Sequence, residues 1–276
     1  MKLYRTKNGI VLSHEGKNSL LENIKWSDFV NDDELYKKAL QTWQTLPAAA
    51  EDVLEKPLAP IGKKQELWAC GVTYLRSKIG REEESKVSGG ADFYSKVYEA
   101  ERPEVFFKAN PWRVVGPGKK LNIRADSSWD VPEPELTLFV TSAAKIVGYT
   151  IGNDMSSRSI EGENPLYLPQ AKTYDDCASL GPCLFVPESP LNTDTVIDMK
   201  ISRKGATVFS GSVAINQMKR SLQELVSFVY RACSFPEGCL IMTGTGIVPG
   251  SDFTLQSGDE ISISIEPIGT LVNKVR

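Results

Sequence analysis

The chain has 276 residues, of which 41% are hydrophobic and 24% charged, and its formal net charge is −3. These totals are typical of a globular protein, and such a charge gives no attraction for nucleic acid or an anionic membrane. The single histidine, His14, excludes any site that needs two imidazoles from one chain, such as a histidine-rich zinc centre. Catalysis must therefore rest mainly on carboxylates, lysine, arginine and hydroxyl groups, with or without a hard metal ion.

The start of the chain and its cysteines indicate a compartment. The sequence MKLYRTKNGIVLSHEG lacks the apolar core of a signal peptide, and no stretch approaches the roughly 18 apolar residues of a membrane span. The five cysteines are odd in number and stand mostly among apolar residues, which is typical of reduced thiols. We therefore expect a cytoplasmic protein with no membrane partner.

The first third of the chain predicts a small separate unit. Asn8-Gly9 lies between two short apolar runs, which is the strongest short-range signal for a β-hairpin. A helical run follows over residues 32–46, with acidic residues at its start. The segment 56–62 contains two prolines and a glycine and interrupts this pattern. We expect a small N-terminal α+β domain over residues 1–62 and a catalytic domain over residues 63–276.

The remainder of the chain predicts many strands and few helices. Short apolar or alternating segments predict strands at 67–74, 105–109, 136–140, 146–151, 184–186, 196–202, 208–210, 240–243, 261–265 and 271–275. The clearest helix begins after Ser221, which forms a capping box with Glu224 ahead of an amphipathic run. Because strands and helices do not alternate regularly, we expect a β-rich α+β fold rather than a doubly wound parallel sheet.

Three acidic residues predict a metal site. Glu133 and Glu135 are two residues apart at the start of a predicted strand, so their side chains lie on the same face. Alone, this pair is more typical of solvated acids at a strand end. Asp154 ends the next predicted strand, and three carboxylates at adjacent strand ends form an all-oxygen site suited to Mg2+ or Mn2+.

Two further segments carry groups that can transfer protons. Lys172 lies in an apolar, proline-bracketed segment, where it is either a surface lysine with a packed stem or a buried functional group. Glu104, Phe106 and Lys108 alternate along one predicted strand and share one face. They therefore form a possible acid and base on either side of an aromatic ring.

A charged segment and a glycine-rich turn complete the candidates. Residues 76–86 carry seven charges in eleven positions and lead into Ser88-Gly89-Gly90, which predicts either a solvated helix face or a lid over a pocket. The turn at 243–250 offers amides and hydroxyls to an anion but lacks the ending of a Walker loop. A turn that ends a strand is the simpler interpretation of this segment.

Taken in order, these segments resemble the fumarylacetoacetate hydrolase superfamily, whose catalytic fold is a mixed β-sandwich roll. The resemblance covers residues 66–275 and rests on several short motifs. They are Phe106-Phe107-Lys108, the Glu133-x-Glu135 strand, GYTIGNDMSSR with its Asp154 and Arg158, the later Lys172, the Leu180-Gly181-Pro182 turn and the Thr243-Gly244-Thr245 turn.

The resemblance implies roles for several residues. In that family two glutamates and an aspartate bind a divalent metal, which implies Glu133, Glu135 and Asp154 as ligands of Mg2+, with Mn2+ or Ca2+ as alternatives. The residues implied to face or position the substrate are Arg158, Lys172, Lys108, Thr245 and Tyr74. Family members form homodimers or homotetramers, and the same is expected here.

One departure from the family pattern favours a particular branch. Hydrolases of the family usually carry a lid histidine that activates water for carbon–carbon cleavage, but Ser77 stands at the matching position. The segments CGVTY, RPEVFFKA, PEPEL and ENPLYLPQAK are most similar to the branch that dehydrates 2-keto-3-deoxy-D-arabinonate to 2,5-dioxopentanoate. The resemblance therefore implies a Mg-dependent dehydratase with Ser77 in its catalytic site.

The expected chemistry passes through a metal-stabilised enolate. A 2-keto acid chelates the ion, a base removes a proton from C3, and hydroxide leaves C4. Lys172 and Glu104 are both candidates for the base, and the sequence does not choose between them. Two other functions remain open: hydrolysis of a carbon–carbon bond in an acylpyruvate or fumarylacetoacetate-type substrate, and binding of a sugar acid without catalysis.

Overall fold

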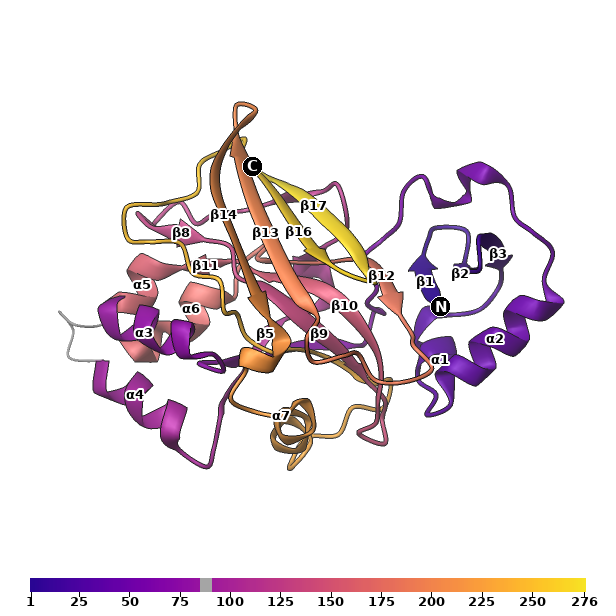
Figure 1. Ribbon diagram of the computed structural model, residues 1–276, viewed down its shortest axis with the longest axis horizontal. Helices are drawn as coiled ribbons and strands as arrows, with labels where there is room; N and C mark the ends of the chain where they lie inside the picture. Colours follow the sequence, from indigo (N-terminus) through magenta and orange to yellow (C-terminus); the bar gives the residue numbers. More distant parts are fainter. Residues whose placement is uncertain (85–90) are drawn as a thin grey trace.

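The structure is a computed structural model that describes residues 1–84 and 91–276. The centre of the fold is a ten-stranded mixed sheet (Figure 1). Its strand order is β3-β2-β1-β12-β10-β9-β15-β4-β5, with β6 paired to β12. The strands of this sheet are β1 (Lys2–Arg5), β2 (Ile10–His14), β3 (Lys17–Leu21), β4 (Glu66–Gly71), β5 (Glu104–Ala109), β6 (Val114–Val115), β9 (Pro134–Val140), β10 (Ile146–Asp154), β12 (Ala178–Phe185) and β15 (Cys239–Met242).

A five-stranded sheet lies in front of the large one in Figure 1. Its order is β14-β13-β16-β17-β7, from β7 (Lys120–Leu121), β13 (Val196–Arg203), β14 (Ala206–Ala214), β16 (Glu260–Ile265) and β17 (Gly269–Val275). Apolar residues of β13 and β16, such as Ile197 and Ile263, share one buried core with Leu136 and Ile151 of the large sheet. This packing of two sheets is the predicted β-rich α+β sandwich, and the fold-class prediction is confirmed.

Most of the helices gather at two ends of the molecule. In Figure 1, α1 (Trp26–Val30) and α2 (Leu35–Thr45) lie beside the N-terminal strands, and four short helices lie at the opposite end. Those four are α3 (Leu75–Glu84), α4 (Ala91–Glu99), α5 (Arg158–Glu163) and α6 (Leu168–Lys172). The last is α7 (Leu222–Val229), and short 3-10 turns lie at 51–54, 111–113, 165–167 and 215–217. A two-stranded sheet joins β8 (Asp130–Val131) to β11 (Ser156–Ser157).

The predicted N-terminal hairpin is confirmed. β1 and β2 pair antiparallel, and Thr6 N–H closes the turn on the carbonyl of Gly9 at 2.9 Å. Gly9 has a φ of 144°, and a Cβ at this position would overlap the carbonyl of Leu21, so only glycine fits. β1 also pairs with β12, which makes the hairpin continuous with the large sheet. The domain boundary near residue 62 stays a prediction.

Two local expectations are wrong. The strand predicted over 67–74 ends at Gly71, because Val72 has a φ of 53° and turns the chain toward α3. The predicted turn at Leu180-Gly181-Pro182 lies inside β12, where backbone pairing with β10 continues on both sides of it. Within residues 1–84 and 91–276, every helix is too short or too polar to cross a membrane.

Candidate active site

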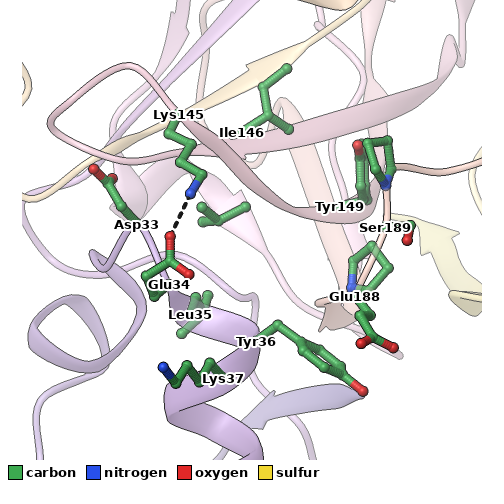
Figure 2. A pocket seen from close by; sticks show the side chains of 13 residues that line it. Asp33, Glu34, Leu35, Tyr36, Lys37, Lys145, Ile146, Tyr149, Glu188 and Ser189 are labelled. Carbon is green, nitrogen blue, oxygen red and sulfur yellow. Dashed lines mark hydrogen bonds and ion pairs between the residues drawn. The ribbon is translucent and has the colours of Figure 1, made fainter.

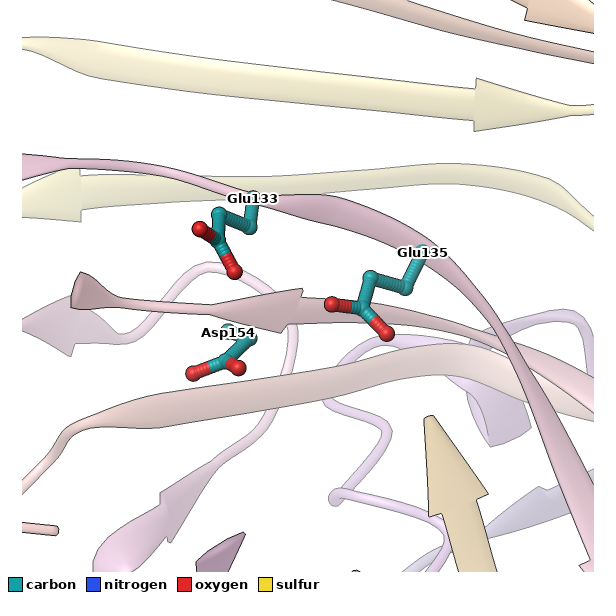
Figure 3. Close-up of side chains that lie close together, drawn as sticks. All are labelled: Glu133, Glu135 and Asp154. Atoms are coloured by element: carbon teal, nitrogen blue, oxygen red, sulfur yellow. The ribbon is translucent and has the colours of Figure 1, made fainter. Parts of the chain in front are cut away.

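Three carboxylates converge where β9 and β10 meet. Glu133 stands just before β9, Glu135 is its second residue, and Asp154 is the last residue of β10. Antiparallel pairing sets Gly152 opposite Glu135, and Asp154 N–H donates to the carbonyl of Glu133 at 2.9 Å. One oxygen of each carboxylate lies within 4.8 Å of the others, and all three residues are buried (Figure 3). The predicted convergence is therefore observed, while metal ligation stays a prediction.

Two buried lysines neutralise this cluster. Lys172 Nζ donates to Glu133 Oε2 at 2.6 Å and to Asp154 Oδ2 at 3.2 Å, and a third bond goes to Ser156 Oγ at 2.6 Å. Lys108 Nζ lies 2.6 Å from Asp154 Oδ1 and donates to two backbone carbonyls. An ammonium group has three protons, and Lys172 has a hydrogen-bond acceptor for each, while Lys108 has two carbonyl acceptors and the ion pair with Asp154. Both side chains are therefore held in place beside the carboxylates.

Two arginines extend the network beyond Glu133. Arg158 Nη2 donates to Glu133 Oε1 at 2.5 Å, and its Nη1 lies 3.6 Å from Glu161 Oε2. Arg81, from α3, contacts Glu161 Oε1 and lies 3.9 Å from Glu133 Oε1. All four residues are at least nine-tenths buried. A buried charge without a partner is strongly unfavourable, so these groups hold one another in position.

The pKa values of the two glutamates shift in opposite directions. Burial alone would raise the pKa of Glu133, but the charges of Lys172, Arg158 and Arg81 hold it well below its usual value. Burial raises the pKa of Glu135, and the neighbouring charges of Asp154 and Glu133 raise it further. A divalent cation among these oxygens would favour the ionised form of Glu135.

A glycine in the turn after β15 orients Glu135. Gly244 N–H donates to Glu135 Oε2 at 2.5 Å. Gly244 has a φ of 95°, and a Cβ there would overlap Thr73 Oγ1, so the turn requires glycine. Thr245 follows, and its hydroxyl bonds to the backbone of Ile247 at 3.2 Å. The segment is thus the turn that ends a strand, and its Gly244 amide donates a hydrogen bond to the Glu135 carboxylate of the site.

Glu104 lies over another glycine beside the site, although it is not among the residues that line the pocket over the carboxylates. It begins β5 and pairs with Gly71 of β4, where a Cβ would overlap Glu104 Oε2. The Oε2 atom is buried and has no hydrogen-bond partner among the described residues. Burial raises the pKa of Glu104, and the charges of Arg81 and Lys172 oppose that rise. Glu104 therefore has a carboxylate oxygen free to accept a proton.

The pocket over the carboxylates is nearly closed. About 10 Å³ of space remains, which is no more than one water molecule requires. The lining residues are Cys70, Gly71, Val72, Ser77, Arg81, Phe106, Glu133, Glu135, Asp154, Lys172, Gly244 and Thr245. Ser77 and Arg81 come from α3, so this helix covers the site, as the lid interpretation of the charged segment predicts. Its continuation over 85–90 lies outside the described residues.

The predicted site residues fall into two groups. Lys172, Ser77 and Thr245 line the pocket, although the Ser77 hydroxyl bonds to the N–H and carbonyl of Tyr74 at the start of α3. Lys108 and Arg158 lie behind the carboxylates and hold them. Tyr74 is buried against Gly246, and burial and the charge of Glu135 raise its pKa. The roles of all these residues stay predictions.

Sequence reasoning missed Arg81 and Glu161. Arg81 is four residues after Ser77 and so shares its face of α3, and Glu161 is three residues after Arg158 on α5. These spacings place each residue on the same helix face as a predicted site residue, and the sequence alone could have shown this. The contact between the two residues, however, joins segments 80 positions apart, and local pattern does not show it.

A larger groove elsewhere carries no comparable chemistry. It has a volume of about 360 Å³ and lies between the start of α2, the β9–β10 turn and residues 187–190 (Figure 2). Lys145 crosses it to Glu34 at 2.8 Å, and both side chains are largely exposed. Exposed pairs of this kind contribute little free energy. The chemistry therefore centres on the carboxylate cluster.

Comparison with known proteins identifies the family. The chain matches the family model described as fumarylacetoacetate (FAA) hydrolase C-terminal over residues 82–276. The chain belongs to the fumarylacetoacetate hydrolase family. The family predicted from the short motifs is therefore confirmed, and the match contains all three carboxylates as well as Lys172.

Two curated relatives of this fumarylacetoacetate hydrolase family member are named dehydratases. A Haloferax volcanii protein named probable 2-keto-3-deoxyxylonate dehydratase is 52% identical over 212 residues, which cover 76% of this chain and 72% of the relative. A Saccharolobus solfataricus protein named 2-dehydro-3-deoxy-D-arabinonate dehydratase is 42% identical over 226 residues, covering 81% and 74%.

A solved structure is similar over the whole chain. It is described as 2-keto-3-deoxy-D-arabinonate dehydratase complexed with magnesium and 2,5-dioxopentanoate. Its TM-score is 0.83 and its sequence identity 32%, over 100% of this chain and 99% of the other. The similarity to this dehydratase thus extends through the N-terminal residues that the family model does not match.

Proposed function

We propose that this protein removes water from a 2-keto-3-deoxy sugar acid, converting 2-keto-3-deoxy-D-arabinonate to 2,5-dioxopentanoate with Mg2+ as cofactor. The observation that carries the proposal is the buried trio of Glu133, Glu135 and Asp154 beside Lys172, in a pocket without histidine. The names of two relatives support it, as do the magnesium and 2,5-dioxopentanoate in the similar solved structure.

The residues present fit a hard divalent cation. Glu133, Glu135 and Asp154 supply only oxygen donors, which Mg2+ prefers, and Mn2+ or Ca2+ would accept the same set. Burial and the charges of Asp154 and Glu133 raise the pKa of Glu135, and a divalent cation bound to the trio would offset both effects. When bound, Mg2+ would polarise the 2-keto group of the substrate and so acidify the hydrogens on C3.

Glu104 is the base that we propose for the C3 proton. Its Oε2 is buried and has no hydrogen-bond partner within residues 1–84 and 91–276, and its raised pKa makes it a stronger base than an ordinary glutamate. The Lys172 amino group, by contrast, already contacts three oxygen atoms at hydrogen-bond distance. We propose that it exchanges one of these hydrogen bonds for one to the substrate carboxylate or keto oxygen.

Charge balance supports this division. Around the pocket, four carboxylates stand beside four cations: Glu133, Glu135, Asp154 and Glu161 beside Lys108, Lys172, Arg81 and Arg158. Mg2+ and a substrate carboxylate together would add one positive charge. Deprotonated Glu104 would neutralise it, so loading of the site favours the form of Glu104 that accepts a proton.

The reaction needs donors as well as a base. In the first stage a proton leaves C3 and hydroxide leaves C4, and the two depart as water. In the second stage one proton moves from C5 to C3, which leaves an enol between C4 and C5. This enol then ketonises to the aldehyde at C5. Ser77 and Thr245 are hydroxyl groups on the pocket wall, and we propose that they contact the departing and remaining hydroxyls of the sugar acid. Phe106 would exclude water from the same wall.

The position of the single histidine argues against the hydrolytic alternative. His14 lies in β2, and its ring packs edge-on against Trp43 with centroids 5.1 Å apart. His14 thus packs against α2 near the N-terminus and does not line the pocket. Ser77 occupies the lid position there instead. An elimination needs no water-activating imidazole, whereas the hydrolases of the family use one.

A substrate panel with Mg2+ tests the proposal. The protein is incubated with 2-keto-3-deoxy pentonates, 2-keto-3-deoxy hexonates and acylpyruvates, and products are identified by mass. Loss of one water from a pentonate supports the dehydratase. Release of pyruvate from an acylpyruvate would support the hydrolase instead. Mg-dependent binding of a sugar acid without turnover would support a binding protein.

We also propose that the chain forms a homodimer or homotetramer in the cytoplasm. Edge strand β14 supports self-association, because its nine residues include neither a charge nor a proline, the features that usually block edge pairing. The five free cysteines, four of them buried, support a reducing compartment. Light scattering after size exclusion tests the assembly, and a monomeric mass would contradict it.

A further inference from the structure

Helix α3 must move before a substrate can enter the site. The remaining space of about 10 Å³ is far too small for a five-carbon sugar acid, and Ser77 and Arg81 of α3 form part of its wall. Arg81 of α3 contacts Glu161 and is 4% exposed. This buried ion pair therefore helps to hold the helix closed over the site.

Glu161 connects this helix to the metal-ligand cluster. One of its oxygens contacts Arg81, and the other lies 3.6 Å from Nη1 of Arg158. Arg158 in turn donates to Glu133 Oε1 at 2.5 Å, and Arg81 lies 3.9 Å from the same oxygen. Glu161 is 1% exposed. It thus joins two guanidinium groups, one on α3 and one on α5, to a single carboxylate of the trio.

The second lid helix takes part in the same contact. The guanidinium of Arg81 lies over the ring of Tyr94 in α4, 5.5 Å from its centroid. At its other end α4 is held by Arg220, which donates to the carbonyls of Val97, Ala100 and Glu101. Arg220 therefore holds the C-terminal end of α4, and the contact of Arg81 with Glu161 holds α3 against α5.

We infer that Glu161 is a positioning residue that couples closure of α3 to the orientation of Glu133 through Arg81 and Arg158. When α3 is closed, both arginines are paired and Glu133 is held by Arg158. When α3 opens, Glu161 keeps only Arg158, whose geometry toward Glu133 then changes. This inference rests on the proposed function, because the site it regulates is the proposed dehydratase site.

Hydrogen exchange tests the coupling without any substrate. Glu161→Gln is expected to speed amide exchange in residues 75–84 at least tenfold, with exchange in α7 unchanged. Arg81→Gln is expected to do the same, and the double variant should exchange no faster than either single one. The matched controls are Arg76→Gln on α3 and Glu163→Gln on α5, both exposed residues that lose the same charges. Unchanged exchange at 75–84, or a uniform rise across the protein, would overturn the inference.

Turnover of the loaded enzyme gives the second readout. With Mg2+ and the pentonate, Glu161→Gln is expected to lower kcat at least tenfold, and Glu161→Asp to restore part of it, since a shorter carboxylate can still pair with one arginine. A kcat within twofold of wild type in Glu161→Gln would overturn the positioning role. Failure of the wild-type protein to dehydrate any sugar acid would instead contradict the proposed function, and the exchange result would still stand on its own.

Discussion

The ammonium of Lys172 lies 2.6 Å from Oε2 of Glu133, inside a cluster of carboxylates that is closed to solvent. This distance describes a charge-assisted hydrogen bond, and Lys172 makes another to Asp154 at 3.2 Å. The fold thus stabilises a concentration of buried negative charge with its own cations. A divalent metal at the same oxygens would take over part of that task.

Replacement of Lys172 by methionine is expected to make stability depend on the metal. Without the ammonium, Glu133 and Asp154 lose a buried partner, and such losses typically lower the free energy of unfolding by about 3–5 kcal/mol. Mg2+ should restore much of this, because it binds the folded state only. Thermal unfolding with EDTA and with Mg2+ measures both effects. Equal melting temperatures for Lys172→Met and wild type in EDTA would contradict this account of the cluster.

The pH dependence of turnover should report Glu104. Its pKa is raised by burial, so the carboxylate becomes protonated at a higher pH than the ordinary glutamate value of about 4.3. A protonated Glu104 cannot accept the C3 proton, and kcat/KM should therefore fall as pH drops through the raised pKa. In Glu104→Gln the acidic limb should vanish together with most activity. An unchanged profile in that variant would assign the base elsewhere, and Glu163→Gln serves as the control.

Gly71→Ala should act through Glu104. A Cβ at Gly71 would overlap Glu104 Oε2, so the glutamate side chain must shift from its present position. We expect turnover to fall by roughly the same factor as in Glu104→Gln, about a hundredfold or more, as is usual for loss of a general base. Adding Gly71→Ala to Glu104→Gln should then have little further effect. Additive losses in the double variant would show that Gly71 has a different role.

Thiol reactivity should distinguish one cysteine from the other four. Cys233 is exposed, whereas the remaining four are buried, and burial raises the pKa of Cys183 to about 12. The thiolate is the reactive form, so buried thiols react slowly. Titration with a thiol reagent at neutral pH should find one rapidly reacting group in the native protein and five after denaturation. Loss of the fast phase in Cys233→Ser checks the assignment.

The carboxylate trio was predictable because it depends on local pattern. Glu133 and Glu135 share a face through the period of a strand, and Asp154 ends the strand that follows. Lys108 and Lys172 could also be predicted as candidates from their local sequence. The carboxylates that they contact could not be predicted in this way. Which carboxylate each lysine holds depends on how β5, β9, β10 and α6 meet in space.

The lid was only partly predictable. The charge density of residues 76–86 suggested a cover, yet the pairing of Arg81 with Glu161 joins two helices that are distant in sequence. The end of β4 was also misjudged, because Val72 adopts a positive φ that its residue type disfavours. Backbone conformations that tertiary contacts impose against local preference are the features that sequence pattern fails to predict.

The most direct test of the central claim is a titration of Mg2+ into EDTA-treated protein, with bound metal and 2,5-dioxopentanoate formed from 2-keto-3-deoxy-D-arabinonate measured in the same samples. Turnover should rise in proportion to occupancy of one Mg2+ per chain, and Glu135→Gln should weaken metal affinity and turnover together. Full turnover in EDTA, or Mg2+ affinity unchanged in Glu135→Gln, would contradict the account.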